Sequence, residues 1–101
     1  MTAAQGQAPR FISLEGGEGA GKSTQIKMLN AWLTEQGFNV CATREPGGSP
    51  GAEEIRELLV KGAGDRWASM TEALLMAASR AEHVERRIKP ALEAGEWVLC
   101  D

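Results

Sequence analysis

The sequence lacks several features that would place it in a specialised class of protein. Its two cysteines, Cys41 and Cys100, lie far apart and neither belongs to a C-x-x-C pair, so neither a zinc site nor a disulfide framework is expected. No apolar run approaches the ~20 residues of a membrane span, and residues 1–10 have no apolar stretch of the kind found in secretory signals. These absences favour a cytoplasmic protein with reduced thiols and no membrane partner.

The chain also lacks any concentration of positive charge. Its 11 lysines and arginines are scattered and are outnumbered by 14 acidic residues, which gives a net charge of −3, whereas nucleic-acid-binding proteins carry a basic stripe or patch. The composition is otherwise ordinary, with 43% hydrophobic residues, 12 glycines and 4 prolines, and is typical of a globular protein. A length of 101 residues allows one domain at most. We therefore expect a single globular domain with no nucleic acid as partner.

Strand-like and helix-like segments alternate along the sequence. Strands that alternate with helices imply a parallel sheet with helical crossovers, and hence an α/β fold. A three-stranded parallel sheet needs covered faces and protected edges, so we expect the natural domain to continue beyond Asp101. Residues 1–9 would form a flexible extension, and residues 10–101 the N-terminal part of that domain. The expected strands are 11–14, 38–43 and 96–101. The expected helices are 22–36, with Gly37 as its C-cap, 52–59, and from about 70 to Gly95, with a kink or a new helical turn at Pro90.

One motif in the chain predicts a chemistry. Residues 16–23 read Gly-Gly-Glu-Gly-Ala-Gly-Lys-Ser, which fits the pattern G-x-x-x-x-G-K-[ST] without a mismatch, after a predicted strand and before a predicted helix. The glycines allow successive backbone N–H groups to face phosphate oxygens, and the following helix N-terminus favours the same anion. The alternative is an ordinary glycine-rich turn that happens to end in Lys-Ser. The predicted ATP-binding residues are Gly16, Gly17, Glu18, Gly19, Ala20, Gly21, Lys22, Ser23 and Thr24.

Three polar side chains have predicted roles in handling the phosphates of ATP. Lys22 should reach the β- and γ-phosphates, and the Ser23 hydroxyl should ligate Mg²⁺. Asp101 ends an apolar strand, a position from which a carboxylate can hold the same ion directly or through water. We therefore predict that Lys22 is a catalytic residue and that Ser23 and Asp101 are metal ligands.

Four segments of the chain, in the same order, resemble the thymidylate kinase family. The first is the run 11–25 around the phosphate loop, and the others are Thr43-Arg44-Glu45-Pro46-Gly47-Gly48, Ser79-Arg80-Ala81-Glu82-His83 and Ile88-Lys89-Pro90-Ala91-Leu92. The resemblance covers nearly the whole chain. It implies a P-loop fold of the nucleoside monophosphate kinase type, and phosphorylation of dTMP to dTDP with ATP and Mg²⁺. It also implies an enzyme that is a homodimer at full length.

The resemblance assigns dTMP-binding roles to two charged residues. A carboxylate 4 Å from a phosphate charge costs ~1–4 kcal/mol, depending on the dielectric, so Glu18 should point away from the phosphates. The resemblance implies that it contacts the 3′-hydroxyl of dTMP. A solvated loop glutamate is the alternative. Arg44 follows the second strand, where open α/β sheets bind ligands, and would approach the monophosphate, although an ion pair with Glu45 or Glu53 is its alternative. Glu18 and Arg44 join Lys22 as the predicted catalytic residues.

The long predicted helix would complete the acceptor site. Four of its residues are spaced to share one face, and an opposite stripe of alanine and leucine is expected to be core; the four are Met76, Arg80, His83 and Arg87. In the family, the position of Arg80 binds the thymine and phosphate side of dTMP, and Pro46 begins a turn that shapes the pocket. Met76 stands where the family commonly has an aromatic residue stacked on thymine, which leaves the choice between dTMP and dUMP open, and a core methionine is its alternative. His83 and Arg87 are residue types more often solvated or salt-bridged than bound to ligand.

Two features limit what these 101 residues are expected to do alone. The phosphate loop has Gly19 where some thymidylate kinases have a basic residue, and enzymes of this second kind supply the catalytic arginine from a lid, which would lie beyond Asp101. Such an arginine can be worth ~10³–10⁵ in rate, so little turnover is expected of the chain by itself. The alternatives are an ATP-binding fragment without turnover, a kinase for another nucleoside monophosphate, and a GTPase or ATPase switch, although the guanine-binding pattern Asn-Lys-x-Asp is absent.

Overall fold

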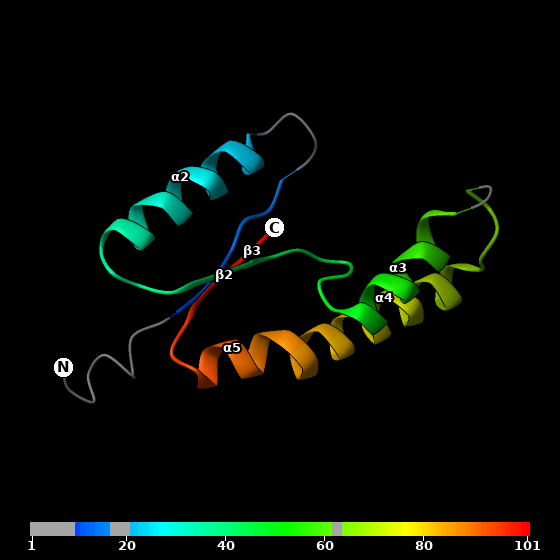
Figure 1. Ribbon diagram of the computed structural model, residues 1–101. Coiled ribbons are helices and arrows are strands. Elements are labelled where there is room, and N and C mark those ends of the chain that lie inside the picture. Colours follow the sequence, from blue (N-terminus) through cyan, green and yellow to red (C-terminus); the bar gives the residue numbers. More distant parts are fainter. Residues whose placement is uncertain (1–9, 17–20, 62–63) are drawn as a thin grey trace. The chain divides into compact units, whose positions relative to one another are not determined.

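The computed structural model describes residues 10–16, 21–61 and 64–101 (Figure 1). The chain divides into two compact units. We call Met1–Arg44 with Pro90–Asp101 the sheet unit, and Glu45–Lys89 the helical unit. The proposed extension at residues 1–9 lies outside the described residues.

The sheet unit is built on three parallel strands. They are β1 (Phe11–Ser13), β2 (Val40–Thr43) and β3 (Trp97–Cys100), and their order in the sheet is β1-β3-β2. The predicted parallel sheet is therefore confirmed, with strands one or two residues shorter than expected. The last strand in the sequence is the central one, so β1 and β2 each pair with β3.

The sheet is apolar along its central strand. Val98, Leu99 and Cys100 are buried, and Cys41 of β2 is buried beside them. A strand covered on both faces needs such a continuous apolar run. Cys41 and Cys100 lie on the neighbouring strands β2 and β3, and both side chains are buried.

Helix α2 (Lys22–Glu35) follows β1 and contacts β2. It begins after Gly21, whose φ of 82° is a left-handed conformation that favours glycine. It ends at Gly37, where the N–H groups of Gly37 and Phe38 donate to the carbonyls of Thr34 and Leu33 at 3.0 and 3.1 Å. This pattern satisfies the last helical carbonyls and confirms the predicted glycine at the helix end.

The helical unit contains two helices that lie side by side (Figure 1). They are α3 (Pro50–Val60) and α4 (Ser69–His83), and α4 is followed by the π-helical turn η1 (Val84–Ile88) and then by α5 (Lys89–Glu93). Proline has no N–H to donate to the carbonyl four residues earlier. A π turn directly before Pro90 therefore agrees with the predicted irregularity there. No helix in the described ranges has the length and hydropathy needed to span a bilayer.

The predicted apolar core face of the long helix is wrong. Leu74 is 62% exposed, while Ser79 and His83 are completely buried. Helical periodicity favours burial of the apolar face, but a polar side chain can be buried when it has hydrogen-bond partners. Ser79 and His83 both have such partners in residues 45–52. Hydrogen bonding to that segment therefore decides which face of α4 is buried.

Candidate nucleotide-binding site

The first candidate site, within the sheet unit, includes the two ends of the phosphate loop. Gly16 and Gly21 both have positive φ angles, 150° and 82°, which side chains rarely adopt. Helix α2 begins at Lys22, so its first turn carries Lys22, Ser23 and Thr24. The predicted strand–loop–helix context is therefore present. The other loop residues named above, Gly17, Glu18, Gly19 and Ala20, lie outside the described residues.

An ion pair joins the phosphate-loop lysine to the last strand. Lys22 Nζ lies 2.7 Å from Asp101 Oδ1, and both side chains are partly exposed. Asp101 is held at the carboxyl end of β3 because its N–H donates to the Thr43 carbonyl at 3.0 Å. Two residues that separate sequence patterns single out therefore meet at the carboxyl edge of the sheet. In open α/β folds this edge is where ligands bind.

Arg44 lies at the same edge of the sheet. It directly follows β2, it is exposed, and it belongs to the sheet unit. Its neighbour in sequence, Glu45, makes its described contacts within the helical unit. The sheet unit thus presents a cationic residue beyond the ends of two of its strands, namely Lys22 after β1 and Arg44 after β2.

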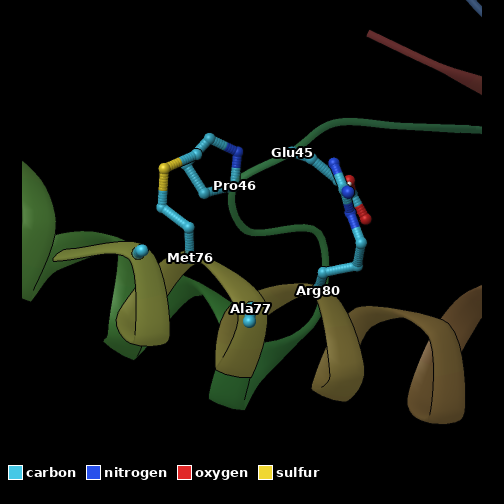
Figure 2. Close-up of a pocket in the computed structure, with 6 residues that line it drawn as sticks. Glu45, Pro46, Met76, Ala77 and Arg80 are labelled. Atoms are coloured by element: carbon cyan, nitrogen blue, oxygen red, sulfur yellow. Dashed lines mark hydrogen bonds and ion pairs between the residues drawn. The ribbon is translucent and has the colours of Figure 1, made fainter. Parts of the chain in front are cut away.

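A second candidate site is a pocket on α4, within the helical unit, which we call the α4 pocket. It encloses about 370 Å³. Figure 2 shows Met76, Ala77 and Arg80 along one side of the helix, with Glu45 and Pro46 on the segment that faces them. Three predicted dTMP-binding residues, Pro46, Met76 and Arg80, are therefore brought together. The complete lining is Glu45, Pro46, Ala73, Met76, Ala77 and Arg80.

The Glu45 carboxylate is bonded on both oxygens. Arg80 Nε donates to Oε1 at 2.7 Å, and His83 Nδ1 lies 2.9 Å from Oε2. Burial by itself would raise the pKa of Glu45, but the hydrogen bonds from His83 and Arg80 and the positive charges of these partners outweigh burial and hold the pKa below its usual value. Glu45 is therefore a carboxylate at neutral pH.

The residues after Glu45 are held by four further side chains. The segment 45–48, which we call the 45–48 loop, has cis geometry at its Glu45–Pro46 bond and left-handed glycines at 47 and 48. The contacts are Arg56 Nη1 to the Pro46 carbonyl at 3.1 Å, the Gly47 N–H to Ser79 Oγ at 3.0 Å, the Gly48 N–H to Glu53 Oε2 at 2.8 Å, and Arg87 Nη1 to the Gly48 carbonyl at 2.9 Å. Ser79 also donates to the Ala52 carbonyl at 3.2 Å. The 45–48 loop forms one wall of the α4 pocket, and each of its residues is held by at least one side-chain contact.

The match to a family model decides the identity of this fold and site. The thymidylate kinase model matches residues 14–101. The chain belongs to the thymidylate kinase family. It is 65% identical over 92 residues to a thymidylate kinase of Rhizorhabdus wittichii, and 65% identical over 91 residues to one of Caulobacter vibrioides.

A solved thymidylate kinase has the same fold as this member of the family. The crystal structure of the enzyme from Ehrlichia chaffeensis superposes with a TM-score of 0.81 at 41% sequence identity, over 93% of this chain and 54% of that chain. This chain spans 44% of the length of the Rhizorhabdus and Caulobacter relatives. The match therefore concerns about half of a thymidylate kinase.

Sequence reasoning missed most of the residues that hold the 45–48 loop. Ser79, Glu53 and Arg56 were not selected. The expectation that His83 is solvated or salt-bridged is met by its pair with Glu45 at 2.9 Å, but its complete burial was not foreseen. A signal was present, because Ser79, His83 and Arg87 recur every four residues and so share one face of the helix. Polar residues at that spacing, opposite a Pro-Gly-Gly turn, are a pattern that predicts a held loop.

The lowered pKa of Glu45 predicts acid sensitivity of the helical unit. A carboxyl group whose pKa is lower in the folded state than in the unfolded state stabilises the fold fully above its unfolded pKa, and this contribution is lost as pH falls through the folded pKa. Stability should therefore fall below pH 4.5, the ordinary value for this group. Urea unfolding of the wild type and of Glu45→Gln between pH 7 and pH 3 measures it, and the variant should lose less stability on acidification.

A matched control for this titration is Glu57→Gln. Glu57 makes an exposed i,i+4 pair with Lys61 at 2.9 Å, and such pairs contribute little to stability. Its acid profile should follow the wild type. Parallel acid profiles for the wild type and Glu45→Gln would contradict the role assigned to Glu45.

Proposed function

We propose that this chain is the nucleotide-binding part of a kinase that transfers the γ-phosphoryl group of ATP to dTMP. An oxygen of the dTMP phosphate forms a bond to the γ-phosphorus, the bond from that phosphorus to the β–γ bridging oxygen breaks, and the products are dTDP and ADP. The observation that carries the proposal is the 2.7 Å pair of Lys22 and Asp101 at the carboxyl edge of the sheet. Membership of the thymidylate kinase family supports the choice of reaction.

The sheet unit would bind ATP through the phosphate loop. Its glycines offer backbone N–H groups, and Lys22 leaves Asp101 to neutralise the β- and γ-phosphates. The hydroxyl of Ser23 and the carboxylate of Asp101 are oxygen ligands of the kind that Mg²⁺ prefers. Mg²⁺ bound to them would neutralise charge on the phosphates. Because phosphoryl transfer depends on positioning and charge neutralisation, no separate base is required.

Five residues are proposed to bind the acceptor, on the basis of the resemblance to the thymidylate kinase family. Arg44 would grip the monophosphate, since a guanidinium can contact two phosphate oxygens at once. In the α4 pocket, Arg80 would face the thymine and phosphate side of dTMP while Pro46 and Met76 pack on the base, where a methionine sulfur makes favourable contacts with an aromatic ring. Glu18 is proposed to bind the 3′-hydroxyl of the deoxyribose.

We also propose that the full-length enzyme is a cytoplasmic homodimer. The resemblance to the thymidylate kinase family, whose enzymes are usually homodimers, supports this proposal. Large apolar side chains are also exposed on both long helices of the helical unit: Leu58 and Val60 on α3, and Met70 and Leu74 on α4.

An ATP-binding chain without turnover is the second candidate function. It is favoured by Gly19, which stands in the phosphate loop where some thymidylate kinases have a basic residue. A chain without a catalytic arginine would be slower by ~10³–10⁵ in rate while it keeps ATP binding.

The test is ADP formation from Mg-ATP with dTMP, dUMP, AMP, GMP or no acceptor. It is run on this chain and on a form extended past Asp101 to the length of the relatives. We expect the extended form to turn over with dTMP in preference to the purine monophosphates, and this chain to bind ATP with little turnover. A preference for AMP or GMP, or ADP formation without an acceptor, would exclude the proposal. Full dTMP-dependent turnover by this chain would show that no later lid is needed.

A further inference from the structure

We propose that His83 is a positioning residue, which holds Glu45 so that Glu45 in turn holds the guanidinium of Arg80 at the α4 pocket. His83 does not line the pocket, whereas Glu45 and Arg80 do. The inference rests on the proposed function in one respect, because it makes dTMP the ligand for which Arg80 is positioned.

The side chains of His83 and Arg80 both contact the carboxylate of Glu45, and we call this set of three side chains the relay. His83 Nδ1 lies 2.9 Å from Glu45 Oε2, and Arg80 Nε lies 2.7 Å from Glu45 Oε1. Arg80 and His83 are three residues apart on α4, so they project from adjacent turns on one side of the helix. Glu45 comes from a different segment, and its carboxylate therefore links α4 to the 45–48 loop as well as linking the two side chains.

The burial of the three side chains shows which of them is held most firmly by its surroundings. The side chain of His83 is completely buried, that of Glu45 is 17% exposed and that of Arg80 is 71% exposed. An exposed arginine has many accessible rotamers and costs ~2 kcal/mol of side-chain entropy to fix, so it cannot define the position of Glu45. A buried imidazole has packing on all sides and little freedom. His83 therefore fixes the position of the Glu45 carboxylate, and Glu45 in turn fixes the position of the Arg80 guanidinium.

The electrostatics of Glu45 keep this relay intact at neutral pH. The lowered pKa of Glu45 means that it remains a carboxylate and accepts from both partners. Hydrogen bonds in which one partner is charged are about twice as strong as neutral ones. Removing the His83 donor leaves Oε2 of a largely buried carboxylate without that bond, and Glu45 is then free to rotate away from the position that holds Arg80.

The first experiment uses NMR on the ligand-free chain to measure how firmly the Arg80 Nε–H group is hydrogen-bonded. The exchange rate of the Arg80 Nε–H proton with water is measured in the wild type, His83→Phe, His83→Ala and His83→Asn. The Phe and Ala variants lack the donor, with and without the ring volume, while the Asn side-chain amide can donate from nearly the place of Nδ1. We expect the Arg80 Nε–H proton to exchange at least about 10-fold faster in the Phe and Ala variants, because its hydrogen bond to the charged Glu45 carboxylate is weakened. In the Asn variant its exchange rate should be within about threefold of the wild-type rate.

The control for lost packing is Ile88→Ala, a truncation of another buried residue in the same helical segment. It should lower stability without changing Arg80 exchange. Wild-type exchange in a folded Phe or Ala variant would overturn the proposal. So would an Asn variant that is folded but exchanges as fast as the Ala variant, or a wild type with no protection of this proton. If neither donor-free variant folds while Ile88→Ala does, His83 is a structural residue and the proposal also fails.

The second experiment measures dTMP binding by calorimetry with the same variants. His83→Phe should weaken dTMP binding by about 10-fold or more, and His83→Asn should stay within about threefold of the wild type. Absence of dTMP binding to the wild type would count against the proposed function, while the exchange data would still decide whether His83 positions Arg80. Unchanged dTMP affinity in a folded His83→Phe variant with fast Arg80 exchange would show that the relay does not serve this ligand.

Discussion

Replacing Lys22 by alanine should weaken the binding of Mg-ATP by at least about 100-fold. A unit charge 4 Å from a phosphate oxygen is worth ~4 kcal/mol at an effective dielectric of 20, and tenfold in affinity corresponds to ~1.4 kcal/mol. The loss is increased by Asp101, because the carboxylate that now lies 2.7 Å from the Lys22 ammonium would face the phosphates without that counter-charge. Titration with a fluorescent ATP analogue, or calorimetry with ATP, measures the effect.

The matched control for this variant is Lys27→Ala. Lys27 is exposed on the same helix, five residues further on, and its removal changes the net charge by the same amount. Its ATP affinity should stay within about twofold of the wild type, since an exposed charge that does not contact the ligand acts on it only through water and salt, which screen it. Equal ATP affinities for Lys22→Ala and Lys27→Ala would mean that residues 16–23 do not form a phosphate site.

Replacing Gly47 by alanine should destabilise the helical unit by about 2–4 kcal/mol, which combines backbone strain with a weakened hydrogen bond. Gly47 has a φ of 118°, and an added Cβ would lie 2.9 Å from Cδ of Glu53. The Glu53 carboxylate cannot move aside at no cost, because it accepts the Gly48 N–H at 2.8 Å. The Gly47 N–H also donates to the buried Ser79 hydroxyl. Urea unfolding followed by tryptophan fluorescence measures the change.

The control for this variant is Gly64→Ala. An added Cβ at Gly64 meets nothing within 4 Å, and Gly64 does not have a positive φ. Its unfolding free energy should change by no more than about 0.5 kcal/mol. The Gly47 variant should also bind dTMP more weakly, since the 45–48 loop carries two residues of the pocket lining. Stability equal to that of Gly64→Ala would contradict the proposed constraint on this loop.

The order and type of the elements followed from local patterns in the sequence. Glycines at 37 and 95 ended helices as predicted, because each takes a left-handed conformation beyond the last helical turn. The strand order does not follow from such patterns, since pairing depends on residues far apart in the chain. Even so, the run Trp97-Val98-Leu99-Cys100 is continuously apolar, and this is typical of a strand buried on both faces and therefore central.

The two candidate sites differed in how far they could be predicted. The pairing of Lys22 with Asp101 follows from motif chemistry, because both residues are required near the same phosphates. The spacing of Ser79 and His83 shows that they share one face of the helix. It does not show that this face is buried, because polar residues are ordinarily expected to face solvent. They are buried because they meet the Gly47 N–H and the Glu45 carboxylate, which come from a segment more than thirty residues earlier. Their position thus depends on tertiary partners.

The central place of β3 has a consequence for biosynthesis. Strand β1 leaves the ribosome early and β2 soon after, but within the described residues each of them pairs with β3 and not with the other. Neither of these two strand pairs can therefore form until Trp97–Cys100 has been translated. Until then two strands present unpaired backbone groups, which are templates for association with other chains. The entropic cost of closing both long connections therefore arises in one step, when β3 inserts between β1 and β2.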